Sequence, residues 1–357
     1  RAAILRLRYD NLPLAMKLTG HLLYIDITQL CGIGCAFCMY ADKHARGSSM
    51  VLTEQARSNL AVLINDPTVK RISVSGEGEP LNNIRAFHDI LRLSRGGKAF
   101  EFITSGFLPH DQLDAFYRAT DELVSAHGDT CNIRLSADSY HLAKVKHRAH
   151  GFSIAYALEQ QLGGLSFSFR SVDTDRRFTR AYLLAEAAAR GLTAQLSRNH
   201  ALGDVLQVDS HEFGIEYKNH VHPSGLLPGQ FLDFYRYIDA IEARYGKRFT
   251  LGSMNRAPSV NGMDVTVKPD GTVHFYGAEH VSLGNVHTDQ LSWAGLQQQL
   301  LGDPLLRTLY GTPILDLLAR IADEPAARQA IARANNPYWV VKELAKTDGL
   351  LERLVEA

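Results

Sequence analysis

Short apolar runs alternate with longer segments of helical periodicity from residue 21 to about residue 197. Six of the runs are rich in β-branched and aromatic residues, which is typical of strands: 22–28, 70–75, 100–104, 131–136, 165–171 and 192–197. The segments between them carry apolar residues at helical spacing: 53–65, 83–95, 109–126, 140–162 and 175–190. This alternation predicts an α/β fold in which strand–helix units surround a parallel sheet.

Signals at the ends of these segments support the alternation. Thr53 stands where the first helix begins, as an N-capping residue does, and Gly191 follows the last helix, as a terminating glycine does. Beyond residue 198 the pattern weakens, because His, Gly and Pro residues cluster between His200 and Gly229. We expect loops that face the substrate there.

The remaining part of the chain predicts a helix over residues 229–245, a β-hairpin over residues 264–276 and further helices at the C-terminal end. The hairpin signal is strong because the alternation turns at Pro269-Asp270-Gly271. We therefore divide the chain into a lead-in, a core and a C-terminal extension, at residues 1–20, 21–228 and 229–357.

Composition narrows the class of protein. The chain has 38 basic and 38 acidic residues, so no net charge steers it to nucleic acid or to an acidic membrane. Its apolar stretches are interrupted well before the ~20 residues that a membrane span needs. Three of its four cysteines are grouped, which is a poor disulfide framework and suits a metal site in a reducing compartment. We expect a cytoplasmic protein with a small-molecule or peptide substrate.

The grouped cysteines, Cys31, Cys35 and Cys38, directly follow the first expected strand. This is the carboxyl edge of the sheet, where α/β folds place their chemistry. Three thiolates can hold three irons of a [4Fe-4S] cluster and leave the fourth iron open to a ligand. Phe37 would shield such a cluster from water.

A zinc site is the alternative interpretation, with Cys131 as the fourth ligand. Zinc sites usually combine two close cysteine pairs, whereas Cys131 lies far from the group, in an expected strand. The spacing therefore favours the iron–sulfur cluster, and we expect Cys131 to be a small buried apolar residue.

The CxxxCxxC spacing, with an aromatic residue before the last cysteine, resembles the radical S-adenosylmethionine superfamily over roughly residues 20–225. The resemblance implies a partial (β/α)6 barrel, similar to a TIM barrel, with a small C-terminal hairpin and a helical extension. It also implies that S-adenosylmethionine chelates the open iron and that an electron donor such as flavodoxin or ferredoxin reduces the cluster. The resulting 5′-deoxyadenosyl radical would abstract a hydrogen atom from the substrate.

The segment after the second strand, Ser75-Gly76-Glu77-Gly78-Glu79-Pro80, resembles the GxGEP element of the same superfamily. Gly76 and Gly78 would let the backbone approach a ligand, and a carboxylate accepts hydrogen bonds from an ammonium group. The resemblance implies that Glu79 holds the methionine amino group of the cofactor. An ordinary loop is the alternative for a Gly-Glu turn that stands alone.

The segment after the fourth strand resembles a further element of the superfamily. Ser136 and Asp138 correspond to residues that approach the cofactor ribose, and Arg148 would bind the cofactor carboxylate with its two-donor fork. Gly151, not the residue directly after Arg148, supplies the glycine of this element. A solvated basic helix face is the alternative for Arg148.

Other polar residues close the remaining strands at the expected active edge. Ser105 follows the third strand, and Arg170 closes the fifth, although an arginine there is also typical of a surface ion pair. Strand periodicity would place Glu216, Lys218, His220 and His222 on one face. If that face lines the barrel mouth, Glu216 or Lys218 could bind or protonate a substrate. The alternative is an exposed polar edge.

Residues 265–285 resemble the hairpin and the Leu-Gly-Asn-Val ending of SPASM or twitch extensions. Those extensions normally carry cysteines for auxiliary clusters, but no cysteine follows Cys131. Because the ligands are missing, we expect no auxiliary cluster within these residues. The hairpin is expected to close the lower or lateral opening of the barrel.

Since only residues 1–20 precede the first strand, we expect no leader-peptide-binding domain and favour a small polar substrate. Cys38-Met39-Tyr40-Ala41 and the cluster-free extension resemble radical enzymes that act on sugars or nucleosides in antibiotic biosynthesis, such as cytosylglucuronate decarboxylases. Decarboxylation, dehydration, epimerisation and alcohol oxidation all begin with the same hydrogen abstraction. A peptide-modifying radical enzyme and a zinc-stabilised binding protein are the alternatives.

Overall fold

Six parallel strands form the centre of the sheet. The computed structural model describes residues 21–35, 38, 47–199, 203–218, 232–246, 248–252, 263–334 and 337–356. In this part of the chain, the strand order is β11-β10-β9-β1-β2-β3-β4-β5-β8-β7-β6. The six barrel strands, which pair parallel with one another, are β1 (His21–Asp26), β2 (Val69–Ser75), β3 (Ala99–Thr104), β4 (Thr130–Ser136), β5 (Leu165–Val172) and β8 (His211–Lys218). The predicted α/β class with a partial (β/α)6 barrel is confirmed.

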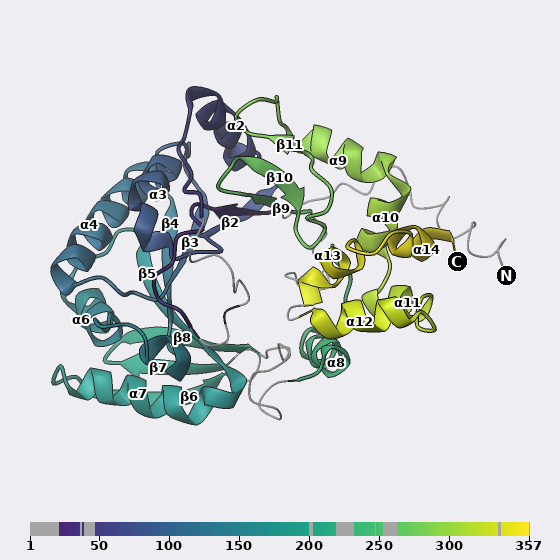
Figure 1. Cartoon of the computed structure of the whole chain (residues 1–357). Helices are drawn as coiled ribbons and strands as arrows, with labels where there is room; N and C mark the ends of the chain where they lie inside the picture. Colours follow the sequence, from purple (N-terminus) through teal and green to yellow (C-terminus); the bar gives the residue numbers. More distant parts are fainter. Residues whose placement is uncertain are drawn as a thin grey trace.

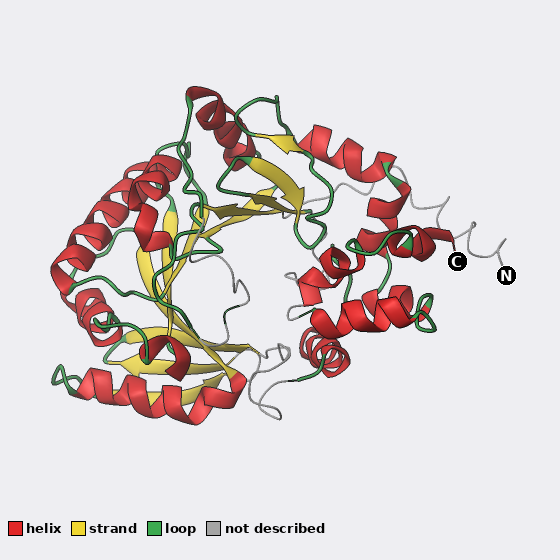
Figure 2. Cartoon of the chain, in the orientation of Figure 1, coloured by secondary structure: helices red, strands yellow, loops and turns green. Residues whose placement is uncertain are grey.

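Helices cover the outer side of the curved sheet (Figure 1, Figure 2). They are α2 (Glu54–Asn65), α3 (Ile84–Leu91), α4 (His110–His127), α6 (His150–Glu159) and α7 (Arg176–Ala188). Three short helical segments lie between strands and these helices along the chain: η1 (Pro80–Asn83), α5 (Ser139–Leu142) and η2 (Asp173–Asp175). Thr53 caps α2 as predicted, since its side chain accepts a hydrogen bond from the Ala56 amide. The single helix expected over residues 140–162 is two helices, because Asp138 caps α5 and the buried His150 begins α6 separately.

The sixth predicted strand, residues 192–197, lies elsewhere in the sheet than expected. It belongs to β6 (Ala194–Asn199), which pairs antiparallel with β7 (Gly203–Val208) at the sheet edge. β7 pairs antiparallel with β8, and β8 lies parallel to β5 as the sixth barrel strand. The loops expected after residue 198 are therefore wrong over β7 and β8. The apolar pattern of β8 is weak, because only every second residue of it is buried.

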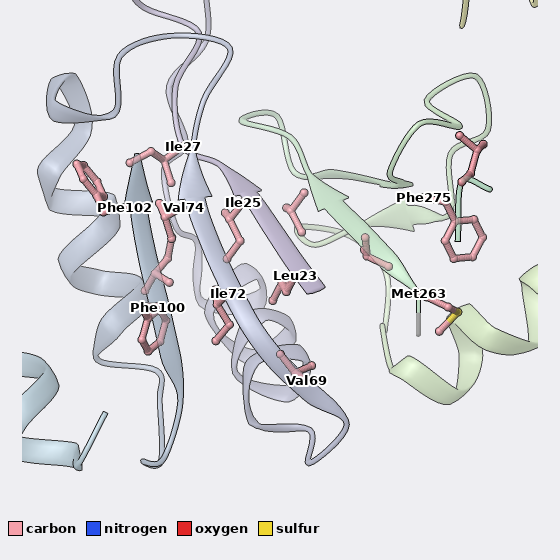
Figure 3. Packing of buried hydrophobic residues seen from close by; sticks show 14 of the residues in the cluster. Leu23, Ile25, Ile27, Val69, Ile72, Val74, Phe100, Phe102, Met263 and Phe275 are labelled. Atoms are coloured by element: carbon pink, nitrogen blue, oxygen red, sulfur yellow. The ribbon is translucent and has the colours of Figure 1, made fainter. Parts of the chain in front are cut away.

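The barrel strands bury one face under the helices and turn the other face inward. On β4, Cys131, Ile133 and Leu135 are fully buried, and Arg134 and Ser136 alternate with them. Figure 3 shows how apolar side chains of β1, β2 and β3 pack together, with Met263 and Phe275 from the extension nearby. The inward face is polar instead, so the barrel interior can surround a hydrophilic ligand.

The C-terminal extension continues the barrel sheet. The predicted hairpin is confirmed: β9 (Asp264–Val267) and β10 (Thr272–Phe275) pair antiparallel, and β9 pairs parallel with β1. The hairpin thus lies at the lateral side of the barrel. The other elements are β11 (Gly284–Asn285), α8 (Phe234–Tyr245), α9 (Trp293–Gly302), α10 (Pro304–Gly311), α11 (Ile314–Ala319), α12 (Pro325–Arg333), η3 (Pro337–Trp339), α13 (Val340–Leu344) and α14 (Leu350–Glu356).

Polar contacts fix the extension to the first strand–helix unit. The Asn59 amide on α2 donates to the carbonyl groups of Val286 and Asp289, at 2.8 and 2.7 Å. The Trp293 ring stacks on His21 with 4.4 Å between ring centroids. None of the described helices is long and apolar enough to span a lipid bilayer.

Candidate functional site

A pocket lies at the carboxyl ends of the parallel strands. It brings together these predicted site residues: Cys31, Cys35, Cys38, Gly76, Gly78, Glu79, Ser105, Ser136, Asp138, Arg170 and Lys218. Residues from the loop after β1 and from the ends of all the other barrel strands thus meet in one place, as the parallel order of the strands requires. Phe37, His220 and His222 lie outside the described residues.

The three thiols Cys31, Cys35 and Cys38 are partly exposed in this pocket. Among the described residues, no three His, Cys, Asp or Glu side chains converge as the ligands of one metal ion do. Cys131 is fully buried in β4, and burial raises the pKa of its thiol. The donor set therefore fits a [4Fe-4S] cluster better than a four-cysteine zinc site.

Gly76 and Gly78 line the pocket and also have a structural role. A Cβ atom at Gly76 would lie 2.5 Å from the carbonyl oxygen of Thr28, and one at Gly78 would lie 2.4 Å from that of Leu30. The Gly78 amide donates to the Thr28 carbonyl at 2.9 Å. The two glycines thus allow close contact with the segment that leads to Cys31, so they hold the cysteine loop in place.

Glu79 is buried, and its carboxylate accepts four hydrogen bonds. Oε1 accepts from the Thr104 hydroxyl at 2.5 Å and from the Leu81 amide at 3.1 Å. Oε2 accepts from the Ser105 amide and hydroxyl, at 2.9 and 2.6 Å. A carboxylate offers about four lone-pair positions, so all of them are in use. A ligand amine reaches this carboxylate only by replacing a hydroxyl donor.

Asp138 forms a tight pair with His141, a pocket residue that the sequence analysis missed. Its Oδ2 lies 2.8 Å from Nδ1 of His141, and its Oδ1 accepts from the His141 amide at 3.0 Å. His141 also has a hydrogen bond with Cys35. Burial opposes both charges, but the bond to His141 lowers the pKa of Asp138, and the bonds to Asp138 and Cys35 raise the pKa of His141 to about 10. The capping position of Asp138, three residues before His141, is the sequence signal for this pair.

A second missed histidine supports Ser136 from behind. His150 is fully buried, and its Nε2 lies 3.0 Å from the Ser136 carbonyl, to which it donates. The Tyr182 hydroxyl donates to Nδ1 of the same ring at 3.0 Å. Burial lowers the pKa of His150 to about 4, so the ring is neutral near pH 7.

Glu216 lies next to the pocket but not in it. It faces Arg170 on the neighbouring strand, with 3.4 Å between Oε2 and Nε, and the same oxygen lies 3.8 Å from Nη1 of Arg134. Although burial opposes the charge, Arg170 and Arg134 lower the pKa of Glu216. The expected role of proton donor or substrate ligand is therefore not supported, because this carboxylate stays charged and holds Arg170 in position.

Arg134 also pairs with Glu101 on β3, at 2.8 Å. Both residues were missed, although the alternation of residues 100–104 and 131–136 places each of them on the inward face.

Lys218 lines the pocket and has no hydrogen-bond or ion-pair partner among the described residues. Burial, followed by the nearby charge of Arg170, lowers the pKa of Lys218 to about 7. The interpretation of Glu216 and Lys218 as an exposed polar edge is thus wrong, since both lie at the inner side of the barrel.

Arg148 does not reach the pocket. Its side chain is exposed, and its guanidinium carbon lies 5.6 Å from the centre of the Tyr182 ring. The structure therefore favours the alternative of a solvated basic face for this residue.

A buried ammonium group connects the extension to the pocket. Nζ of Lys268, in the hairpin turn, lies 3.2 Å from Asp26, 2.9 Å from Glu77 and 2.8 Å from Glu279. Burial alone would lower the pKa of Lys268, but the three carboxylates together raise it. Glu77 lines the pocket and also accepts a hydrogen bond from Gln29, at the start of the cysteine loop. No sequence signal links these residues, because they come from separate parts of the chain.

The sequence matches no protein-family model, and it matches no curated protein. The solved structures that it resembles include hexahistidine-tagged anSMEcpe with bound AdoMet, at 15% identity and a TM-score of 0.44. Native anSMEcpe with bound AdoMet and Cp18Cys peptide gives 14% and 0.44, and native anSMEcpe with bound AdoMet gives 15% and 0.42. Each comparison covers 76% of this chain and 79% of the other.

Proposed function

We propose that this protein is a radical S-adenosylmethionine enzyme that acts on a small polar intermediate, a sugar or a nucleoside. The observation that carries the proposal is the gathering of Cys31, Cys35 and Cys38 in one pocket with Glu79 and the polar ends of the later barrel strands. Three thiolates and a polar pocket are the parts that an open cluster and a sulfonium cofactor need.

Cys31, Cys35 and Cys38 would hold the [4Fe-4S] cluster, with Phe37 as its proposed shield. When bound, the cluster would supply the electron that cleaves S-adenosylmethionine and yields the 5′-deoxyadenosyl radical. Ser136 would donate or accept a hydrogen bond at the cofactor ribose, and Asp138, held by His141, would accept one.

The wall formed by β4, β5 and β8 supports a hydrophilic substrate. Arg170 and Lys218 line it, and both are charged or chargeable. Because the pKa of Lys218 is about 7, its amine can take up or release a proton near neutral pH, as a general acid–base group does. We favour decarboxylation or a related elimination as the outcome, and dehydration, epimerisation or alcohol oxidation of a sugar as the alternatives.

Anaerobic reconstitution with iron and sulfide tests the cofactor assignment. We expect Cys35→Ala to lose bound iron and all cleavage of S-adenosylmethionine, because one of three cluster ligands is gone. Cys131→Ala is the matched control, since this cysteine lies buried in β4, and it should keep both iron and cleavage. Equal iron loss in the two variants would instead support a four-cysteine metal site.

Labelled substrates test the substrate class. Deuterium should pass from a sugar or nucleoside uronic acid into 5′-deoxyadenosine when the reduced protein is incubated with S-adenosylmethionine. Transfer from a peptide alone would show that the small-substrate proposal is wrong and that the protein modifies peptides.

A further inference from the structure

The pocket contains a cation, the ammonium group of Lys218, that forms no ion pair with a described residue. Lys218 ends β8, and among the described residues no carboxylate lies within ion-pair distance of its amine. Asp138 is the carboxylate on the same side of the pocket, but its oxygen atoms are already engaged by the amide and ring of His141. Lys218 is half-buried, so its ammonium group has lost part of its hydration and a ligand of opposite charge would be favoured here.

Arg170 beside it has spare hydrogen-bonding capacity. A guanidinium group has five N–H donors, but the side chain of Arg170 forms no hydrogen bond to another described residue. Its ion-pair partner in the described part of the chain, Glu216, is shared with Arg134. The donors of Arg170 that face the pocket are therefore available to a ligand.

The charges around Arg170 and Lys218 also favour an anionic ligand. Arg134, Arg170, Arg244 and Lys218 carry four positive charges when the lysine is protonated, and Glu101 and Glu216 carry two negative charges. An anionic ligand would reduce this excess of positive charge. A planar carboxylate suits this cationic site, because its two oxygen atoms can accept two parallel hydrogen bonds from an arginine and one from a lysine.

We propose that Arg170 and Lys218 form a binding site for the carboxylate of the substrate, so that the enzyme acts on an acidic sugar or nucleoside. This inference rests on the proposed function, because it takes the ligand to be the substrate. The methionine carboxylate of the cofactor is the other source of the same chemical group. If the two cations bind the substrate and not the cofactor, the affinity for S-adenosylmethionine does not change when Arg170 or Lys218 is replaced.

Calorimetric titration of the anaerobically reconstituted protein tests the site. The probes are D-glucuronate, inorganic phosphate as a simple oxyanion, D-glucose as the uncharged counterpart, and S-adenosylmethionine, at constant ionic strength. We expect Arg170→Gln and Lys218→Gln each to weaken glucuronate binding roughly tenfold or more, the effect of one charge-assisted hydrogen bond. The affinity for S-adenosylmethionine should stay within about twofold, which is less than one weak hydrogen bond.

Two further variants make the result specific. Arg118→Gln removes an exposed arginine of α4, paired with Asp114, and should change no affinity. Arg170→Lys keeps the positive charge but loses the planar guanidinium that donates two parallel hydrogen bonds. This variant should therefore retain phosphate binding better than glucuronate binding. Unchanged unfolding midpoints check that the variants keep their fold.

Three results would overturn the inference. The first is glucuronate binding of equal affinity in all variants. The second is that the unmodified protein binds neither glucuronate nor phosphate. The third is that the variants lose affinity for S-adenosylmethionine but bind both oxyanions as tightly as the unmodified protein. The last result would assign the two cations to the cofactor. A protein that binds glucuronate through this pair but holds no iron would refute the proposed function and leave the carboxylate site standing.

Discussion

The two sides of the pocket differ in how fully the protein satisfies their charged groups. The first side, here the cysteine wall, consists of Cys31, Cys35, Cys38, residues 76–80, Thr104 and Ser105. The second side, here the cationic wall, consists of Arg170 and Lys218. In the cysteine wall, the Glu79 carboxylate accepts four hydrogen bonds, and Lys268 behind it contacts three carboxylates. In the cationic wall, Lys218 has no such partner among the described residues.

We infer from this difference that the cysteine wall supports the fold and that the cationic wall binds a ligand. Groups that are paired within the protein stabilise the fold and keep the cysteine loop in position before any ligand arrives. Charged side chains that lose contact with water and have no partner in the protein lower the free energy of unfolding. Proteins keep such side chains where they pair with a bound ligand. The two lysines, Lys268 and Lys218, are therefore a matched pair for testing the comparison.

The largest effect is expected for Lys268→Met. Removal of this ammonium leaves Asp26, Glu77 and Glu279 close together without a cation, so the free energy of unfolding should fall by about 3–5 kcal/mol. Urea unfolding at pH 7 measures this change. Lys342→Met is the control, because Lys342 is 43% exposed and pairs with a single carboxylate among the described residues, that of Glu279, so its loss should cost less than about 1 kcal/mol. Similar losses in both variants would contradict the interpretation of Lys268 as a central support.

An effect of intermediate size is expected from His150, which lies under Ser136 where the two walls meet. Its folded-state pKa of about 4 is below the unfolded value of 6.5, so its contribution is fully present above pH 6.5 and is lost as the pH falls towards 4. The loss amounts to about 3 kcal/mol by pH 4. His150→Gln keeps a donor for the Ser136 carbonyl but cannot be protonated, so its unfolding free energy should fall less over this pH range. Parallel pH profiles for the two proteins would show that His150 is not the responsible group.

The smallest effect on stability is expected for Lys218→Met. Since the half-buried ammonium group of Lys218 has no ion-pair partner among the described residues, the free energy of unfolding at pH 7 should stay within about 1 kcal/mol or rise. The same urea unfolding experiment measures it beside Lys268→Met. A loss as large as that of Lys268→Met would show that the cationic wall, too, is part of the frame.

The sequence predicted the parts of the fold that depend on local signals. Apolar alternation revealed β1 to β5, and the Pro269-Asp270-Gly271 turn revealed the hairpin. It misplaced the sixth parallel strand, because the apolar run at residues 192–197 has the same local pattern as a barrel strand but pairs antiparallel at the edge. Pairing partners are chosen by contacts between distant segments, which no local pattern contains.

For the site, the sequence was enough to predict that the three thiols and the polar residues at the strand ends lie together. Parallel strands bring their carboxyl ends to one edge of the sheet, however the rest of the chain packs. Only the tertiary structure decided which charges meet. It paired Glu216 with Arg170, turned Arg148 away from the pocket, and brought Lys268 to three carboxylates from three separate segments. The physical reason is that the strength of a charge interaction depends on distance and burial, and both are set by packing rather than by position along the chain.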